Sequence, residues 1–197
     1  MAKLLYQGHG SYRIVSESGF VLYVDPFAGK GYDLPADMVL VSHEHFDHNR
    51  VKLVTLKSGG EIFRSADLLS GGVYGRVERG GVSVQATPAY NGHHAKDECV
   101  GFLITVDGVR VYAAGDTSRT DYMEQVLAKD PPDYAILPID GIFNMGPREA
   151  SECAALIGAR HSIPVHSFPG GLYDEKKART FQAEGRLLVK PGEEIAL

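Results

Sequence analysis

The stretch MVLVSHEHFDH, residues 38 to 48, carries the strongest structural signal in the sequence. Its first four residues are all apolar, which predicts a buried strand. In the extended segment that follows, His43 and His45 project to the same side and can bind one ion, while Asp47 and His48 turn toward a neighbouring position. Because imidazoles and carboxylates are costly to bury without partners, we interpret the segment as a metal-ligand cluster with room for two ions.

Further polar residues lie where other predicted strands end. Val82 to Ala86 is followed by a loop with His93 and His94, Val109 to Ala113 by Asp116, and Ile163 to Val165 by His166. Ligand sites in open α/β sheets collect at the carboxyl ends of strands. Three strand ends that each offer histidine or aspartate therefore favour one shared site.

The rest of the pattern predicts short strands. They are expected at Ser11 to Val15, Phe20 to Val24, Met38 to Val41, Val82 to Ala86, Val100 to Val106 and Val109 to Ala113. Asp107-Gly108 joins the last two runs as a type I′ turn, because both residues accept positive φ angles. The run from Ser58 to Gly81 is rich in glycine and has no period that assigns it.

Helices are predicted in the second half. One begins at Pro147, a good first helical residue, and ends near Gly158, and its apolar residues fall on one face at Ala150, Cys153, Ala154 and Ile157. Asp174 to Ala183 is a second helical candidate, and the tail is predicted to close as a hairpin of Arg186 to Val189 with Glu194 to Leu197. Nothing divides the chain, so we expect one domain over residues 1 to 197, a layered α/β sandwich with its helices outside.

Composition limits the classes of partner. The chain has 197 residues, 44% of them hydrophobic, which is enough for one sizeable core. A formal net charge of −5 without a dense Lys/Arg block favours a small-molecule substrate over nucleic acid. Cys99 and Cys153 lie among apolar or small residues and are expected to be buried thiols, which implies a reducing cytoplasm. No run has the length of a signal peptide or membrane helix, so we expect neither export nor membrane insertion.

The run from His43 to His48 resembles the His-x-His-x-Asp-His signature of the metallo-β-lactamase superfamily. Val24-Asp25-Pro26, Gly115-Asp116-Thr117 and Ile163-Pro164-Val165-His166 are similar, in the same order, to the superfamily's other site segments. The resemblance spans nearly the whole chain and implies a four-layer αββα sandwich. More narrowly, Gly8-His9-Gly10-Ser11 and other short motifs are similar to an uncharacterised branch of metal-dependent hydrolases near the L-ascorbate-6-phosphate lactonases.

The resemblance implies a centre with two divalent ions. One ion would be bound by His43, His45 and His94, the other by Asp47, His48 and His166, and Asp116 would bridge the two. Asp25 would orient a ligating histidine by accepting its other N–H. Zinc is the favoured ion, and manganese, iron or nickel suit the same ligands.

The resemblance also bears on residues beside these ligands. His94 is preferred to His93 as a ligand because its spacing to Val100-Gly101 fits the branch better, and His93 is then a neighbour that could touch substrate. His9 resembles a family position, and we expect it to support a ligand or to touch substrate. His161 is interpreted as a solvated residue at a helix end. Tyr90 and Asp140 could reach the site, but we interpret them as a core tyrosine and a loop aspartate.

This centre predicts a hydrolase. Two ions that share a water would lower the pKa of that water to about 7, and Asp47 could orient it or accept its proton. The expected bond is an ester, lactone or phosphodiester. A nuclease of the tRNA-maturing type would need a basic stripe that the chain lacks, and a flavin-partnered oxidoreductase would need a second domain. A mononuclear iron dioxygenase and a non-catalytic metal-binding module are compatible with the same ligands.

Overall fold

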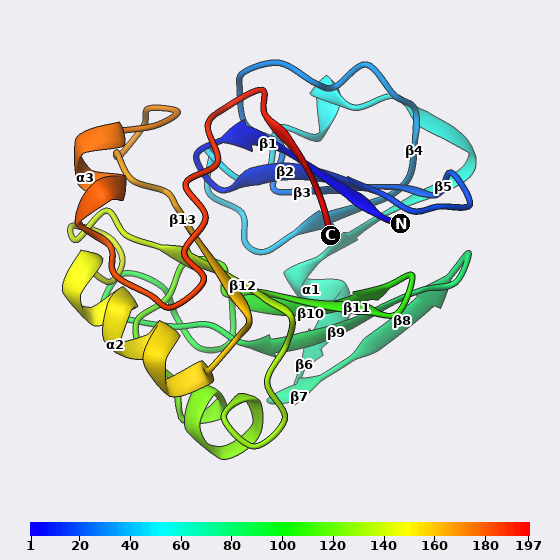
Figure 1. Cartoon of the computed structure of the whole chain (residues 1–197). Coiled ribbons are helices and arrows are strands. Elements are labelled where there is room, and N and C mark those ends of the chain that lie inside the picture. The colour runs from blue at the N-terminus through cyan, green and yellow to red at the C-terminus, as the bar shows by residue number, and fades with distance from the viewer.

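The computed structural model describes residues 1 to 197 and contains two six-stranded sheets stacked face to face (Figure 1). The first sheet, in the order β14-β1-β2-β3-β4-β5, contains β1 (Lys3–Gly8), β2 (Ser11–Val15), β3 (Val21–Val24), β4 (Ala36–Val41), β5 (Leu56–Arg64) and β14 (Glu194–Ala196). The second, in the order β13-β12-β11-β10-β9-β8, contains β8 (Arg76–Arg79), β9 (Val82–Pro88), β10 (Val100–Val106), β11 (Val109–Ala113), β12 (Tyr134–Pro138) and β13 (His161–Val165). β6 (Leu69–Ser70) and β7 (Val73–Tyr74) form a separate ribbon.

The main core lies between the two sheets. It is a cluster of 26 buried residues, which includes Tyr6 and Leu40 from the first sheet and Phe102, Ile104 and Ile136 from the second. Burying a large apolar side chain of this kind contributes roughly 1.5–3 kcal/mol relative to leaving it exposed. The apolar alternation along the strands therefore determines which face of each sheet turns inward.

Helical segments cover the outer face of the second sheet (Figure 1). These are α2 (Pro147–Ile157), α3 (Glu175–Thr180) and the π-helical turn η2 (Met123–Leu127), which pack with the outward side chains of β11 and β12 in a cluster of 15 buried residues. The four apolar residues predicted to face inward from α2 are all buried. The helix begins at Pro147 and its C-cap Gly158 has a φ of 70°, as the sequence predicts.

The outer face of the first sheet has a thinner cover. Tyr23 and Val39 pack there against Tyr32 and Leu34 of the loop between β3 and β4, and against Val51 of the short 3₁₀ helix η1 (Val51–Leu53). The α/β sandwich is confirmed, but this outer layer is loop and a single turn instead of long helices. β3 and β4 are parallel neighbours joined only by residues 25 to 35, and that crossover is too short to contain a helix.

The two sheets share one pairing pattern. From β14 to β5 the pairs are three antiparallel followed by two parallel, and the same sequence of pairs runs from β8 to β13. β3, β4, β11, β12 and β13 all take part in parallel pairs. The polar residues that follow these strands can therefore meet at one edge of the sandwich.

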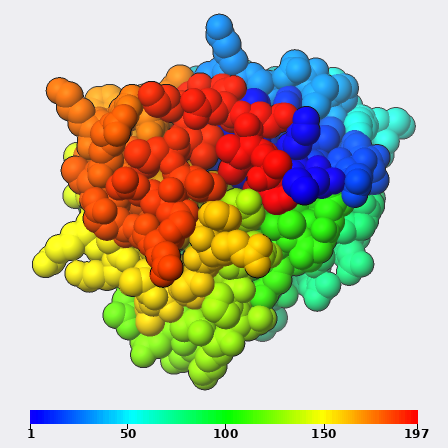
Figure 2. Space-filling view, in the orientation of Figure 1, coloured from blue at the N-terminus to red at the C-terminus, as the bar shows by residue number.

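The predicted C-terminal hairpin is wrong. Arg186 lies beside Ser162 of β13 in the second sheet, whereas β14 pairs antiparallel with β1 in the first. The two halves of the tail thus go to different sheets, and in the space-filling view the red tail fills the surface between the blue N-terminal strand and the orange segment around α3 (Figure 2). Val189 and Leu197 are buried in the main core, which explains why the tail is apolar.

Other segments also differ from the predictions. The unassigned run from Ser58 to Gly81 forms most of β5, then α1 (Ser65–Leu68) and β6 to β8. The second helix is shorter than expected, with Asp174 as an N-cap that accepts a hydrogen bond from the Lys177 N–H. His161 does not end a helix: it begins β13, with its ring 5.0 Å from that of Tyr134.

Cys99 and Cys153 are buried and unbonded, as predicted. No helix of the structure is long and apolar enough to cross a membrane.

Candidate metal centre

Polar residues from both sheets meet beyond the ends of their strands. Asp25 follows β3, His43 follows β4, Asp116 follows β11 and His166 follows β13. Four non-glycine residues of the chain have a positive φ, and apart from Asp107 in its turn they are His9 (58°), Asp25 (46°) and His166 (47°). Such backbone conformations are uncommon for residues other than glycine, although aspartate and histidine adopt them more readily than most, and they concentrate at functional sites.

A first group of donors consists of His43, His45 and His94, whose potential ligand atoms all lie within 4.8 Å of one another. The ring centroid of His43 is 4.4 Å from that of His45 and 4.9 Å from that of His94. His43 and His94 are buried and His45 is exposed. Three imidazoles at this spacing suit one transition-metal ion.

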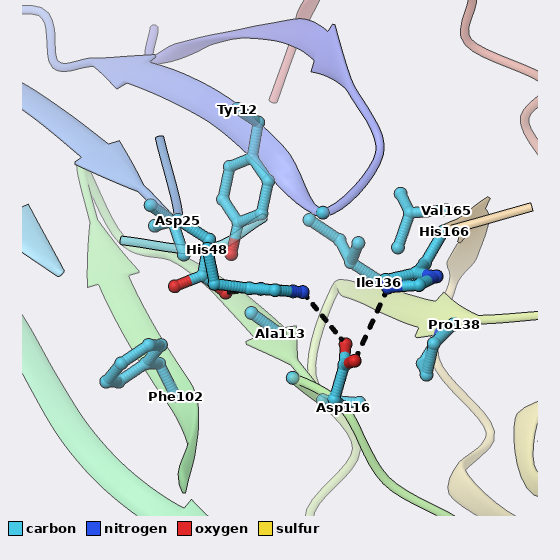
Figure 3. A pocket seen from close by; sticks show the side chains of 14 residues that line it. Tyr12, Asp25, His48, Phe102, Ala113, Asp116, Ile136, Pro138, Val165 and His166 are labelled. Carbon is cyan, nitrogen blue, oxygen red and sulfur yellow. Dashed lines mark hydrogen bonds and ion pairs between the residues drawn. The ribbon is translucent and has the colours of Figure 1, made fainter. Parts of the chain in front are cut away.

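A second group lies beside the first. It consists of His9, Asp47, His48 and His166, again with ligand atoms within 4.8 Å of one another. Three of its members are the predicted ligands of the second ion, and His9 is an addition. The apolar residues Tyr12, Phe102, Ile136 and Val165 line a small hollow together with His48 and His166 (Figure 3).

Asp116 contacts members of both groups, and Figure 3 shows its carboxylate directed toward His48 and His166. Its Oδ2 is 3.4 Å from Nε2 of His94 and 3.4 Å from Nε2 of His166, and its Oδ1 is 3.5 Å from Nε2 of His48. Ligands that share a tetrahedral ion at 2.0–2.1 Å are separated by about 3.4 Å. These separations therefore fit donors arranged around ions.

Each buried histidine of the centre turns the same nitrogen inward. Nδ1 has an oxygen partner behind the ring: Ser42 Oγ for His43 (2.9 Å), Asp25 Oδ2 for His48 (2.9 Å), Asn91 Oδ1 for His94 (3.1 Å) and Asp140 Oδ2 for His166 (3.1 Å). When such a ring is neutral and its proton is on Nδ1, Nε2 presents its lone pair to the interior. Nε2 of His43, His48 and His166 is buried without a hydrogen-bond partner, which is what a ligand nitrogen requires. The Nδ1 contact of His166 with Asp140 is a close charged contact outside hydrogen-bond geometry.

Asp25 supports both groups from behind. It accepts hydrogen bonds from the Ser42 N–H (2.7 Å), the Ser42 hydroxyl (2.6 Å) and His48 Nδ1 (2.9 Å). The Ser42 oxygen in turn accepts from His43, so one carboxylate fixes the orientation of two imidazoles. The role expected for Asp25 is compatible with this geometry.

Asp140 was predicted to be a loop aspartate, and the structure instead buries it against His166. Burial opposes its ionisation, but the adjacent His166 ring and hydrogen bonds from the Phe143 and Ile142 N–H groups lower the pKa of its carboxyl to about 2. The sequence held a signal for this residue, since Asp140 follows the end of β12 as Asp25 follows β3. Asn91 was also missed, and its side-chain oxygen accepts from the His93 and His94 N–H groups as well as from the His94 ring.

Electrostatics divides the histidines into two kinds. Burial and the neighbouring His48 lower the pKa of His43 to about 2, and burial lowers the pKa of His94, so both rings are neutral near pH 7, as metal binding requires. Burial acts in the same direction on His166, but Asp116 and Asp140 outweigh it and raise its pKa to about 10. The second group thus carries excess negative charge that attracts protons or a metal cation.

Two adjoining hollows open onto the donors. One, of about 360 Å³, is lined by Asp47, Asp116 and His166 and is flanked by Phe46 and Phe143. The other, of about 420 Å³, contacts the first group and has the acidic residues Glu44, Asp97 and Glu98 in its wall. His93 is exposed, lines both hollows and packs its ring on Phe143, but it belongs to neither donor group.

Comparisons with known proteins identify relatives of this chain. A family described as "Beta-lactamase superfamily domain" matches residues 3–166. The chain is 30% identical to a UPF0173 metal-dependent hydrolase of Thermococcus onnurineus, with 100% of both chains covered, and 33% identical to one of Methanoculleus marisnigri, with 98% of this chain and 96% of the relative covered. Its fold is similar to that of Igni18, a metallo hydrolase from Ignicoccus hospitalis, with a TM-score of 0.75 and 22% identity over 98% of this chain and 97% of the other.

Proposed function

Because this chain belongs to the beta-lactamase superfamily and, within it, to a family of metal-dependent hydrolases, we propose that it hydrolyses an ester, lactone or phosphodiester of a small molecule at two adjacent divalent ions. The observation that carries the proposal is the position of Asp116. Its Oδ2 is 3.4 Å from a nitrogen of each donor group, so one carboxylate oxygen could serve both ions. This geometry supports two neighbouring positions over a single ion.

The donors divide between the ions as follows. His43, His45 and His94 would hold one ion, Asp47, His48 and His166 the other, and Asp116 would contact both. Zinc is the favoured ion for histidine and carboxylate ligands, and manganese, iron or nickel suit them as well. When bound, the pair supplies a water that is acidic enough to ionise near neutral pH and polarises the substrate oxygen.

The chain's own residues orient the reactants. Burial disfavours the charged form of Asp47, but the neighbouring His9 ring and the charge of His48 keep its pKa below the usual range, so it stays a carboxylate. Its side chain is 15% exposed and lines the smaller hollow, where it can accept a proton from water. Asp25 and Asp140 hold the rings of His48 and His166, which limits reorganisation during the reaction.

The hollows indicate the size and character of the substrate. Phe46 and Phe143 are 63% and 45% exposed beside the donors, and they offer apolar contact to one side of a small molecule. Glu44, Asp97 and Glu98 make the neighbouring wall acidic, which disfavours a polyanion such as RNA.

A metal count and a substrate panel test the proposal. The protein is purified without added metal, its metal content is measured by mass spectrometry, and turnover of lactones, esters and phosphodiesters is measured before and after chelation. We expect two ions per chain and a hydrolysis that stops with chelator and returns with metal. The double variant His43→Ala/His45→Ala should lose metal and activity together.

Other results would contradict the proposal. Two ions per chain with no turnover of any panel member would favour a metal-stabilised binding module. One iron per chain with consumption of dioxygen would favour a dioxygenase. Unchanged metal content in the double variant would place the ions elsewhere.

A further inference from the structure

His9 occupies a fixed and unfavourable backbone position between β1 and β2. Its φ of 58° lies in the left-handed region, and its side chain is fully buried. Its N–H donates to Leu172 O at 2.6 Å, and its carbonyl accepts from the His166 N–H and the Tyr6 hydroxyl, each at 2.8 Å. Three hydrogen bonds thus hold the backbone where the ring must reach the second donor group.

The ring of His9 follows the rule of the other buried histidines. Its Nδ1 is 2.9 Å from the carbonyl oxygen of Gly171, and because a carbonyl only accepts, this nitrogen carries the proton. Nε2 is thereby turned toward the interior. His43, His48, His94 and His166 present Nε2 in the same way.

The groups around Nε2 of His9 favour a cation between this nitrogen and Asp47. It is 3.2 Å from Oδ2 of Asp47, and its ring centroid is 3.7 Å from that of His166. In the neutral ring both Nε2 and the carboxylate oxygen present lone pairs, which repel at this distance unless a proton or a metal ion lies between them. Two ligands of one ion at 2.0–2.1 Å are about 3.0–3.4 Å apart, so the separation suits a shared metal.

We propose that His9 is an additional ligand of the ion bound by Asp47, His48 and His166. The inference rests on the proposed two-metal centre and refines it. The second ion would then have five protein donors, counting Asp116, against four for the first. Zinc prefers four ligands, whereas manganese, iron, cobalt and nickel accept more, so the second position would favour these ions.

The variant His9→Asn tests the role of Nε2 separately from that of Nδ1. Asparagine tolerates a positive φ, and its amide nitrogen can replace Nδ1 as donor to Gly171 O, but nothing replaces Nε2. His161→Asn, at a histidine that begins β13 outside the donor groups, is the matched control. Metal-free proteins are titrated with Co²⁺ and followed by absorption, equilibrium dialysis and X-ray absorption.

Wild type and His161→Asn should bind two Co²⁺ ions. His9→Asn should retain one and bind the second more than about 100-fold more weakly, which exceeds the usual cost of losing a supporting hydrogen bond. At saturation its mean number of imidazoles per cobalt should fall, and its absorption should shift toward that of lower coordination. Two ions bound by His9→Asn with unchanged affinity and spectrum would overturn the inference. Fewer than two ions in wild type would instead contradict the two-metal centre itself.

A measurement on wild type decides the matter if His9→Asn fails to fold. In ¹⁵N-labelled protein loaded with Zn²⁺, the Nε2 resonance of His9 should show a metal-bound nitrogen without a proton. A proton on both nitrogens would mean that His9 donates to Asp47 as an imidazolium, and the inference would fail.

Discussion

At the scale of single residues, the centre depends on which ring nitrogen faces inward. The density of histidines between residues 43 and 48 predicts metal binding, because packing alone does not explain it. The density of histidines does not predict which nitrogen of each imidazole carries the proton. The partners that decide this come from four separate segments: Ser42, Asp25, Asn91 and Asp140. The partner of each imidazole is a property of the fold.

The first residue-scale prediction concerns the charge of Asp116. Asp116→Asn keeps the size of the side chain but replaces one charged oxygen, and it should lower kcat at least about 100-fold because one carboxylate no longer serves both ions. Far-ultraviolet circular dichroism should be unchanged, which separates the effect from misfolding. Normal turnover in this variant would remove Asp116 from the reaction.

The adjacent histidines 93 and 94 should respond differently to substitution. His94→Ala removes a buried Nε2 beside Asp116, so it should empty or weaken one metal position and lower kcat. His93→Ala removes an exposed ring packed on Phe143, so it should raise KM with metal content unchanged. Metal analysis and steady-state kinetics on both variants check this. If His93→Ala loses a metal and His94→Ala keeps both, the ligand is His93.

At the scale of elements, turn and capping residues in the sequence correctly predicted the local structures that they determine. The hairpin of β10 and β11 pairs Val106 with Val109 around Asp107-Gly108, and α2 runs from Pro147 to its cap at Gly158, as expected. β14 was paired wrongly because its partner, β1, lies at the opposite end of the chain. The run from Ser58 to Gly81 was not assigned because its strands are largely exposed and lack apolar alternation.

The cap of α2 gives an element-scale prediction. Gly158 has a φ of 70°, and a Cβ there would come no nearer than 3.9 Å to Pro131, so Gly158→Ala meets backbone strain without a clash. It should cost about 1–2 kcal/mol and lower Tm by roughly 2–8 °C in thermal unfolding. Gly92→Ala, where no positive φ and no close atom is present, should change stability little. Equal effects of the two substitutions would show that the left-handed cap does not matter.

At the scale of the whole molecule, the centre joins the two sheets. Asp25 and His48 belong to the first half of the sandwich, and Asp116, Asp140 and His166 belong to the second. No single element contains a complete donor group, so metal binding requires the packed sandwich. The unfolded chain cannot bind an ion with the same donors.

Metal should therefore stabilise the fold. A ligand that binds only the folded state at about 100 times its Kd adds about 2.7 kcal/mol to the free energy of unfolding. Chelation should lower Tm, and stepwise addition of Zn²⁺ should raise it again. A Tm that does not change with metal would show that the ions are not bound by donors which folding brings together.

The last prediction concerns pH. Without metal, Asp116 and Asp140 outweigh burial and raise the pKa of His166 to about 10, so this ring is protonated at pH 7. A metal ligand must be neutral, so binding of the second ion displaces that proton. The affinity for this ion should rise with pH throughout the range below the pKa, by about tenfold per pH unit for each proton displaced. Calorimetric titration between pH 6 and 8, in buffers of different ionisation enthalpy, measures the released protons directly. A binding enthalpy that is independent of the buffer, with an affinity that is flat in pH, would mean that His166 is already neutral or does not bind the metal.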